Sequence, residues 1–228
     1  MKSRVFFSSV DNYKTSSVLE KIKKLLLKLE PDNLFEKDNL IAVKVHFVEL
    51  GNTSFLRPEY LRPVIEILKK AGTQPFITDT NCLYVGMRTN SVDHLLNATY
   101  NGFNFSTLQV PVIIADGLRG ENSRSVEVNL KLLKKVKLAE DIINSDGMVA
   151  VSHFKGHELA GFGGALKNLG MGCAAREGKL AQHSNIAPSV KKKNCIGCGL
   201  CVKWCSHGAI MMAGDKAEIQ AKTCVGCA

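Results

Sequence analysis

The sequence predicts an α/β fold with a largely parallel sheet flanked by helices, followed by a small cysteine-rich α+β module. Helix-like and strand-like segments alternate through the first part of the chain, a rhythm typical of parallel sheets. Apolar runs rich in β-branched residues are typical of strands that are covered on both faces. With 228 residues, the chain has room for one substantial domain and an appendage. We expect an α/β body over 1–187 and the module over 188–228.

The elements of the body follow from periodicity and from breakers. An amphipathic pattern predicts a helix over 12–30, which Pro31 ends, and Pro58 and Gly72 bracket a second helix over 58–70. Further helices are expected over 91–97 and 138–144, and strands over 39–47, 76–78, 110–115 and 147–152. The pattern over 125–136 suits an outer strand or a hairpin arm. A segment over 186–193, rich in lysine, is expected to link body and module.

Four of the predicted strands end on polar or ionisable residues, which are His46, Asp79, Asp116 and His153. Ligands of open α/β sheets bind outside the carboxyl ends of the strands, so these side chains could line one crevice. The alternative is that each strand simply ends where polarity begins.

The densest group of reactive side chains lies in the segment 152–158. If the extended conformation continues, His153, Lys155 and His157 point to the same side. Two imidazoles around an ammonium suit an anionic substrate or a phosphate, and the two histidines could alternatively be metal ligands. We expect His46, Asp79, His153, Lys155 and His157 to supply acid/base or orienting groups.

A glycine-rich segment follows, with five glycines between Gly161 and Gly172. Such density suggests a backbone that approaches a ligand closely, with amides available to an anion, although no nucleotide-binding motif is present. The residues expected to bind the ligand here are Gly163, Gly164, Lys167, Asn168, Arg176 and His183. A glycine-rich hinge between lobes is the competing interpretation.

The C-terminal segment carries cysteines at metal-binding spacing, C-x2-C-x2-C-x3-C and then C-x2-C. Bacterial-type ferredoxins hold iron–sulfur clusters with this spacing, and glycines between the cysteines let the backbone wrap a compact cluster. The expected ligands are Cys195, Cys198, Cys201, Cys205, Cys224 and Cys227. A four-cysteine zinc site is the alternative, but zinc ribbons usually separate their two C-x2-C pairs by a longer insert.

These cysteines are two short of what a pair of clusters needs. In two-cluster ferredoxins the fourth cysteine of each run binds the other cluster, so each set here lacks one thiolate. We therefore expect the sequence to be part of a longer protein with two 4Fe-4S clusters. Cys82 or Cys173 could instead complete a cluster from the body, or both are ordinary buried thiols.

Composition sets further bounds. Apolar residues make up 45% and charged residues 22% of the chain, as in ordinary globular proteins. Cysteines at metal spacing, together with the absence of a signal-like or membrane-spanning segment, predict a cytoplasmic protein. The net charge of +9 comes from lysines that flank apolar helix patterns, so nucleic acid is not an expected partner. Basic patches could instead steer an acidic electron-transfer partner.

The body motifs and the cysteines together resemble a known family. They are Val43-Lys-Val-His46-Phe, Thr78-Asp79-Thr80-Asn81, His153-Phe-Lys155-Gly-His157 and the segment from Gly163 to Gly172. With the C-terminal cysteines, these resemble the iron–sulfur-centre proteins of the domain of unknown function 362 family. The resemblance implies an α/β body carrying a ferredoxin-like module with two 4Fe-4S clusters, and it supplies no substrate.

We therefore expect an iron–sulfur oxidoreductase that relays electrons between a redox partner protein and an anionic small ligand in the body. One alternative is a non-redox enzyme that uses a metal held by His46, His153, His157 or His183, with structural clusters. The other is an electron carrier or docking subunit whose body binds only a partner protein.

Overall fold

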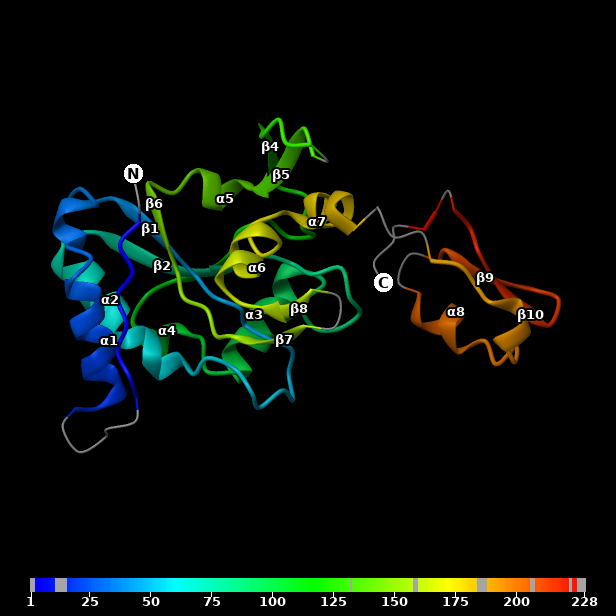
Figure 1. Cartoon of the computed structure of the whole chain (residues 1–228), viewed down its shortest axis with the longest axis horizontal. Coiled ribbons are helices and arrows are strands. Elements are labelled where there is room, and N and C mark those ends of the chain that lie inside the picture. Colours follow the sequence, from blue (N-terminus) through cyan, green and yellow to red (C-terminus); the bar gives the residue numbers. More distant parts are fainter. Residues whose placement is uncertain are drawn as a thin grey trace.

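The centre of the molecule is a four-stranded parallel sheet, as the sequence predicts. We describe a computed structural model of the chain, in which residues 3–10, 16–131, 133–157, 160–183, 188–205, 208–221 and 223–224 are described. The strands are β1 (Leu40–Lys44), β2 (Gln74–Asp79), β3 (Val112–Ile114) and β6 (Gly147–Ala150), in the order β3-β2-β1-β6. Figure 1 shows helices on both sides of this sheet, so the α/β fold is confirmed.

Helices connect and cover the strands. The α-helices of the body are α1 (Val18–Leu27), α2 (Arg62–Lys70), α3 (Ser91–Tyr100), α4 (Phe105–Leu108), α5 (Glu140–Ile143), α6 (Ala165–Gly170) and α7 (Arg176–His183). Two 3-10 turns, η1 (Pro31–Asn33) and η2 (Pro58–Leu61), lie where prolines start a new segment. The helix α1 begins with a capping box, in which the Ser17 hydroxyl accepts from the Glu20 N–H and the Glu20 carboxylate accepts from the Ser17 N–H.

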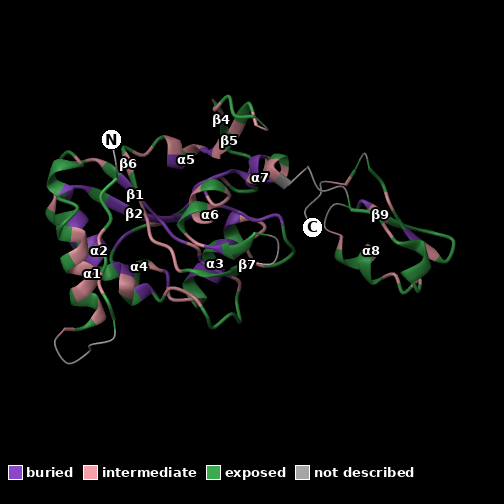
Figure 2. Ribbon diagram, viewed as in Figure 1, coloured by how far each residue is buried: buried purple, intermediate pink, exposed green. Residues whose placement is uncertain are grey.

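The hydrophobic core lies between the sheet and its helices. Fully buried side chains from β1 and β2, such as Val43 and Ile77, pack with Leu61, Leu68 of α2 and Phe103. Figure 2 shows buried residues concentrated along β1 and β2 and on the adjoining helices. Strands covered on both faces explain why their sequences read as nearly continuous apolar runs.

Two antiparallel hairpins extend the body. The segment 125–136 contributes to the first, which pairs β4 (Ser123–Glu127) with β5 (Lys135–Ala139). The helix expected over 138–144 is therefore too long, because Leu138 and Ala139 belong to β5 and α5 begins only at Glu140. The second hairpin pairs β7 (Lys155–His157) with β8 (Gly161–Gly163).

The C-terminal segment contains both helix and strand. Its elements are η3 (Lys192–Asn194), α8 (Leu200–Trp204) and an antiparallel pair of β9 (Ile210–Ala213) and β10 (Lys216–Ile219). Little of it is buried, Ala209 and Ala217 being the exceptions among its described residues, and Trp204 is 65% exposed. The expected linker falls partly, and Cys227 wholly, outside the described residues. No described helix has the length and apolar character needed to cross a membrane.

The backbone takes an unusual turn just after β1. Val48 is buried and adopts a φ of 51°, a left-handed conformation that β-branched residues rarely enter. Two amide side chains hold this turn, one from α3 and one from the residue that follows it. Asn97 Nδ2 donates to the Val48 carbonyl at 2.6 Å, and Asn101 Nδ2 donates to the Phe47 carbonyl at 2.9 Å. The turn fixes the direction in which the chain leaves β1.

We expect Asn97→Ala to lower the free energy of unfolding by about 1–3 kcal/mol, because a buried carbonyl in a strained turn loses its donor. Thr99→Ala, on the exposed side of α3, is the matched control and should change it by less than about 0.5 kcal/mol. Urea denaturation followed by far-ultraviolet circular dichroism measures both. Equal stability of the two variants would contradict the role assigned to Asn97.

Candidate functional site

The strand order creates a crevice at the carboxyl edge of the sheet. From β1 the chain moves to β2 and then β3 on one side, and later returns to place β6 on the other side of β1. Connections that leave in opposite directions open a crevice, which is where ligands of such sheets bind. His46 follows β1 and His153 follows β6, so both lie at this position.

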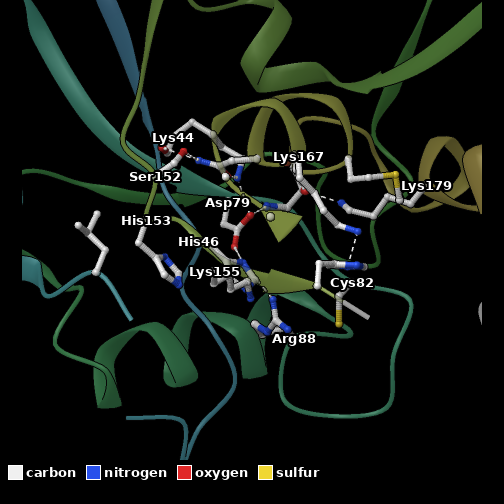
Figure 3. Close-up of a pocket in the computed structure, with 18 of the residues that line it drawn as sticks. Lys44, His46, Asp79, Cys82, Arg88, Ser152, His153, Lys155, Lys167 and Lys179 are labelled. Atoms are coloured by element: carbon white, nitrogen blue, oxygen red, sulfur yellow. Dashed lines mark hydrogen bonds and ion pairs between the residues drawn. The ribbon is translucent and has the colours of Figure 1, made fainter. Parts of the chain in front are cut away.

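A cavity of about 260 Å³ occupies this place. Its lining combines residues that follow β1, β2 and β6 with residues of the β7–β8 hairpin, α6 and α7 (Figure 3). The polar and ionisable side chains that line it are Lys44, His46, Asp79, Thr80, Cys82, Tyr84, Arg88, Ser152, His153, Lys155, His157, Lys167, Asn168 and Lys179. Seven of the residues that the sequence singles out thus lie together with Gly163 and Gly164.

A buried ion pair forms the floor of the cavity. Lys44 is fully buried, and its Nζ donates to Asp79 Oδ1 at 2.9 Å, to Asn168 Oδ1 at 2.7 Å and to the Val45 carbonyl at 2.7 Å. These three bonds use all three hydrogens of the ammonium. Burial alone raises the pKa of Asp79, but the Lys44 charge and a hydrogen bond from His46 outweigh it and hold the pKa well below its usual value.

The imidazole of His46 lies beside this carboxylate. Its Nδ1 is 3.4 Å from Asp79 Oδ2 and 3.4 Å from Arg88 Nη1. Nδ1 donates to Asp79 when it carries a proton and accepts from Arg88 when it does not, so the tautomer determines which contact is made. Burial lowers the pKa of His46 although Asp79 opposes the shift, which favours a neutral ring. Figure 3 shows Asp79 between Lys44 and His46.

A second histidine backs the same carboxylate. His94 on α3 is completely buried, its Nε2 lies 3.8 Å from Asp79 Oδ2, and burial lowers its pKa to about 3. The ring is therefore neutral at physiological pH, and its Nδ1 is 3.4 Å from Asn81 Oδ1. His94 does not line the cavity; it packs behind Asp79, and its Nε2 forms no hydrogen bond with the described residues.

Asp116 lies behind the cavity lining instead of in it. Its carboxylate accepts from the Asn81 backbone N–H at 2.9 Å and from Asn81 Nδ2 at 2.9 Å. Burial raises its pKa to about 6. Of the four strand-end residues, His46, Asp79 and His153 therefore reach the cavity, while Asp116 organises the loop after β2.

The β7–β8 hairpin forms another wall. Lys155 and His157, on β7, both line the cavity, as their alternation along an extended strand predicts, and His153 lies just before that strand. His153 Nε2 is buried and has no hydrogen-bond partner among the described residues, and burial lowers the pKa of its ring. Such a nitrogen is available to a polar atom of a ligand. Lys155 is exposed, with no ion-pair partner among the described residues.

For three cationic side chains of this site, no role is predicted from the sequence. Lys44 lies inside an apolar run, and a lone lysine in a strand covered on both faces is the signal that could reveal it. Arg88 donates to Glu49 at 3.0 Å, from a loop whose sequence has no recognisable signal. Lys179 of α7 is buried between the Thr80 hydroxyl and the Ala174 carbonyl, and burial lowers its pKa to about 8.

Some predicted residues do not reach the cavity. Arg176 donates to the carbonyls of Thr89 at 3.3 Å and Arg119 at 3.4 Å and so ties two loops together, and the side chain of His183 lies outside the described residues. In the glycine-rich segment, close packing requires Gly172, where a Cβ would lie 2.1 Å from the Asn168 carbonyl oxygen and 2.9 Å from Lys44 Nζ. The backbone here thus approaches other parts of the chain closely.

The cysteine segment has features that suit thiolates. The Ala217 and Gly197 N–H groups lower the pKa of Cys195, and the Ala217 N–H lies 3.4 Å from its sulfur. The Ala209 N–H donates to Cys205 Sγ at 3.2 Å. N–H···S bonds of this kind tune iron–sulfur centres, so the donor set suits such a group chemically. The described sulfurs do not converge, however.

In the described part of the chain, no group of three or more histidine, cysteine, aspartate or glutamate side chains is placed to hold a metal ion. Cys82 and Cys173 are buried in the body, and burial raises the pKa of both thiols. They therefore remain protonated, which disfavours metal binding. This matches the interpretation of these two residues as ordinary buried thiols.

We expect Lys44→Met to reverse the pH dependence of stability. In the parent protein Asp79 has a lowered pKa, so its stabilising effect disappears only as the pH falls through that low value. Without the ammonium, burial raises the pKa above the unfolded value of about 3.9. The folded variant then binds more protons than the unfolded chain, and its stability falls as the pH rises from about 4 to 7.

The variant should lose about 3–5 kcal/mol at pH 7 and less at pH 5, as measured by urea denaturation. Lys23→Met is the control, because it removes an exposed ion pair in which Lys23 Nζ lies 3.7 Å from a Glu66 carboxylate oxygen. This variant should lose less than about 1 kcal/mol at either pH. If the free energy of unfolding depends on pH in the same way in Lys44→Met and in the parent protein, the proposed coupling of Lys44 to Asp79 is contradicted.

The sequence matches one family model among those of known proteins. The model described as Domain of unknown function (DUF362) matches residues 41–223, which include most of β1, every cavity-lining residue and most of the cysteine segment. No curated protein and no solved structure matches the chain. The family match spans most of the sequence, and the chain therefore belongs to the DUF362 family.

Proposed function

We propose that the protein is an iron–sulfur oxidoreductase whose body binds a small anionic substrate in the cavity at the carboxyl edge of the sheet. The charge balance of the cavity is the observation that carries this proposal. Among its described lining residues Asp79 is the one carboxylate, whereas five carry basic groups: Lys44, Arg88, Lys155, Lys167 and Lys179.

The cations differ in how far the protein itself neutralises them. Lys44 is paired with Asp79, and Arg88 with Glu49, whereas Lys155, Lys167 and Lys179 have no ion-pair partner among the described residues. Placing like charges together around a cavity is unfavourable unless a ligand offsets them. A carboxylate or phosphate group supplies the missing negative charge and accepts charge-assisted hydrogen bonds.

The neutral imidazoles complete a site suited to proton transfer. His46 contacts Asp79, which orients the ring, and His153 offers a nitrogen without a partner. Both rings have lowered pKa values because they are buried, so each can accept a proton near neutral pH. We assign His46 and His153 to acid/base work, with Lys155 and Lys179 binding the anion.

The cysteine segment is assigned to iron–sulfur binding on the basis of its ligand chemistry. Cys195, Cys198, Cys201 and Cys205 have the spacing that serves 4Fe-4S clusters, and the N–H···S bonds to Cys195 and Cys205 stabilise thiolate charge. Such clusters supply single electrons, which an external redox partner protein would provide or accept. The residues of the body would bind the substrate and move its protons.

Anion binding tests the cavity. We expect pyrophosphate to bind to the protein in isothermal titration calorimetry, with about tenfold lower affinity for Lys155→Ala because one charge-assisted contact is lost. Lys70→Ala, an exposed lysine of α2, is the control and should bind as the parent does. Affinity should also fall as the pH rises through about 8, where Lys179 loses its proton. Equal affinities for both variants would contradict the assignment.

Iron and acid-labile sulfide test the cysteine segment. Anaerobically purified protein should contain the two in equal amounts, and Cys198→Ser should lower both, since it removes a proposed ligand. Cys82→Ala, which removes a buried thiol of the body, should leave both unchanged. Stoichiometric zinc without sulfide would overturn the iron–sulfur assignment.

A further inference from the structure

The hydrogen bonds of His157 determine the protonation state of a neighbouring lysine. Its Nδ1 accepts from the Ala160 backbone N–H at 3.1 Å, so this nitrogen carries no proton. Its Nε2 is hydrogen-bonded to Lys167 Nζ. A neutral imidazole with an accepting Nδ1 has its single proton on Nε2.

It follows that Nε2 donates and Lys167 Nζ accepts. An ammonium has no lone pair with which to accept, so this arrangement requires Lys167 to be an uncharged amine. The surroundings are consistent with that state. Burial, and secondly the positive charge of Lys155 on β7, lower the pKa of Lys167, and no carboxylate of the described residues forms an ion pair with it.

An uncharged lysine amine is a nucleophile, whereas an exposed lysine is almost fully protonated at neutral pH. Lys167 is on α6 and lines the cavity together with Lys155 and Lys179, which remain available to an anionic group. Figure 3 shows Lys167 and Lys179 along the part of the cavity next to α6. The same cavity therefore combines anion-binding charges with an amine that can attack an electrophile.

We propose that Lys167 forms an imine with a small carbonyl compound that carries a carboxylate, with His157 as the residue that positions the amine and, by donating to it, favours its uncharged state. The Nζ lone pair attacks the carbonyl carbon to form a C–N bond. The two hydrogens of the amine then leave with the carbonyl oxygen as water, and a C=N bond remains. The step needs no oxidant or reductant. It rests on the anion-binding function proposed for the cavity, and it specifies the class of substrate.

Trapping with glyoxylate and sodium borohydride tests the proposal, because borohydride reduces an imine to a stable amine. Peptide mass spectrometry then gives the labelling rate of each lysine. At pH 7.5 we expect Lys167 to be labelled at least about tenfold faster than exposed Lys70, because a larger fraction of its amine is uncharged. Lys167→Arg replaces the amine with a guanidinium that cannot form an imine and should abolish the fast label, while Lys70→Arg should leave it unchanged.

A second variant tests the role of the imidazole. His157→Leu removes the donor to Lys167 Nζ, so the amine should regain its proton and its labelling rate should fall about tenfold at pH 7.5. The rate should recover at higher pH, which a purely structural role of His157 would not produce. Circular dichroism establishes that the variant is folded. If the labelling rate of Lys167 in His157→Leu depends on pH as it does in the parent protein, the proposed role of His157 is overturned.

Pyrophosphate separates this inference from the function on which it rests. If Lys167 is labelled fast in the absence of pyrophosphate and pyrophosphate slows this labelling, both the anion site and the reactive amine are supported. Pyrophosphate binding that is lost in Lys155→Ala, with Lys167 labelled no faster than Lys70, overturns the nucleophile and leaves the anion site intact. Fast labelling of Lys167 without any pyrophosphate binding overturns the anion site and the carboxylate-bearing substrate, and leaves the reactive amine.

Discussion

The buried ion pair of Lys44 and Asp79 is the interaction on which the rest of the site depends. It joins the end of β1 to the end of β2, and through Asn168 it also fixes α6, the helix that carries Lys167. Asp79 further accepts from the backbone N–H groups of Thr80 and Phe47. A charge buried this deeply is tolerated only with such full coordination, because an unpaired one would cost several kcal/mol. The geometry of the cavity floor is therefore rigidly determined.

The neighbouring cations serve a different purpose from Lys44. Where a lysine donates to a carboxylate and to backbone carbonyls, as Lys44 does, its charge is part of the fold. Lys155 and Lys167 have no such carboxylate among the described residues, so the charge of Lys155 and the amine of Lys167 are available for chemistry. The same residue type thus stabilises the sheet edge in one place and supplies reactive groups to the same cavity. Burial and hydrogen-bond partners make the difference.

Much of the fold follows from local sequence patterns, because strands covered on both faces must be apolar throughout and helices carry clear start signals. The edge where His46, Asp79 and His153 meet follows from the parallel strand order. Other features depend on tertiary contacts. Leu138 resembles the start of a helix but pairs with Arg124 across a hairpin.

The function of single cations is harder still to predict from sequence. Arg176 is of a residue type that often binds anions in pockets, yet its guanidinium donates hydrogen bonds to two loop carbonyls. In the sequence, Lys44 is a single polar residue within an apolar strand. Its role becomes clear only from the structure, in which it pairs with the Asp79 carboxylate of β2. The protonation state of Lys167 depends on a backbone N–H of Ala160, which no side-chain pattern can reveal.

The position of Trp204 has a spectroscopic consequence. It is the single tryptophan of the chain, it ends α8 and it is largely exposed beside Cys205. The four tyrosines, which are Tyr13, Tyr60, Tyr84 and Tyr100, all belong to the part of the sequence before the cysteine segment. Emission excited selectively from indole therefore originates wholly in the cysteine segment, and a light-absorbing group bound to the thiols would quench it. The two parts of the chain thus carry separate intrinsic fluorophores, which lets the loading of the cysteine segment be followed independently of the folding of the body.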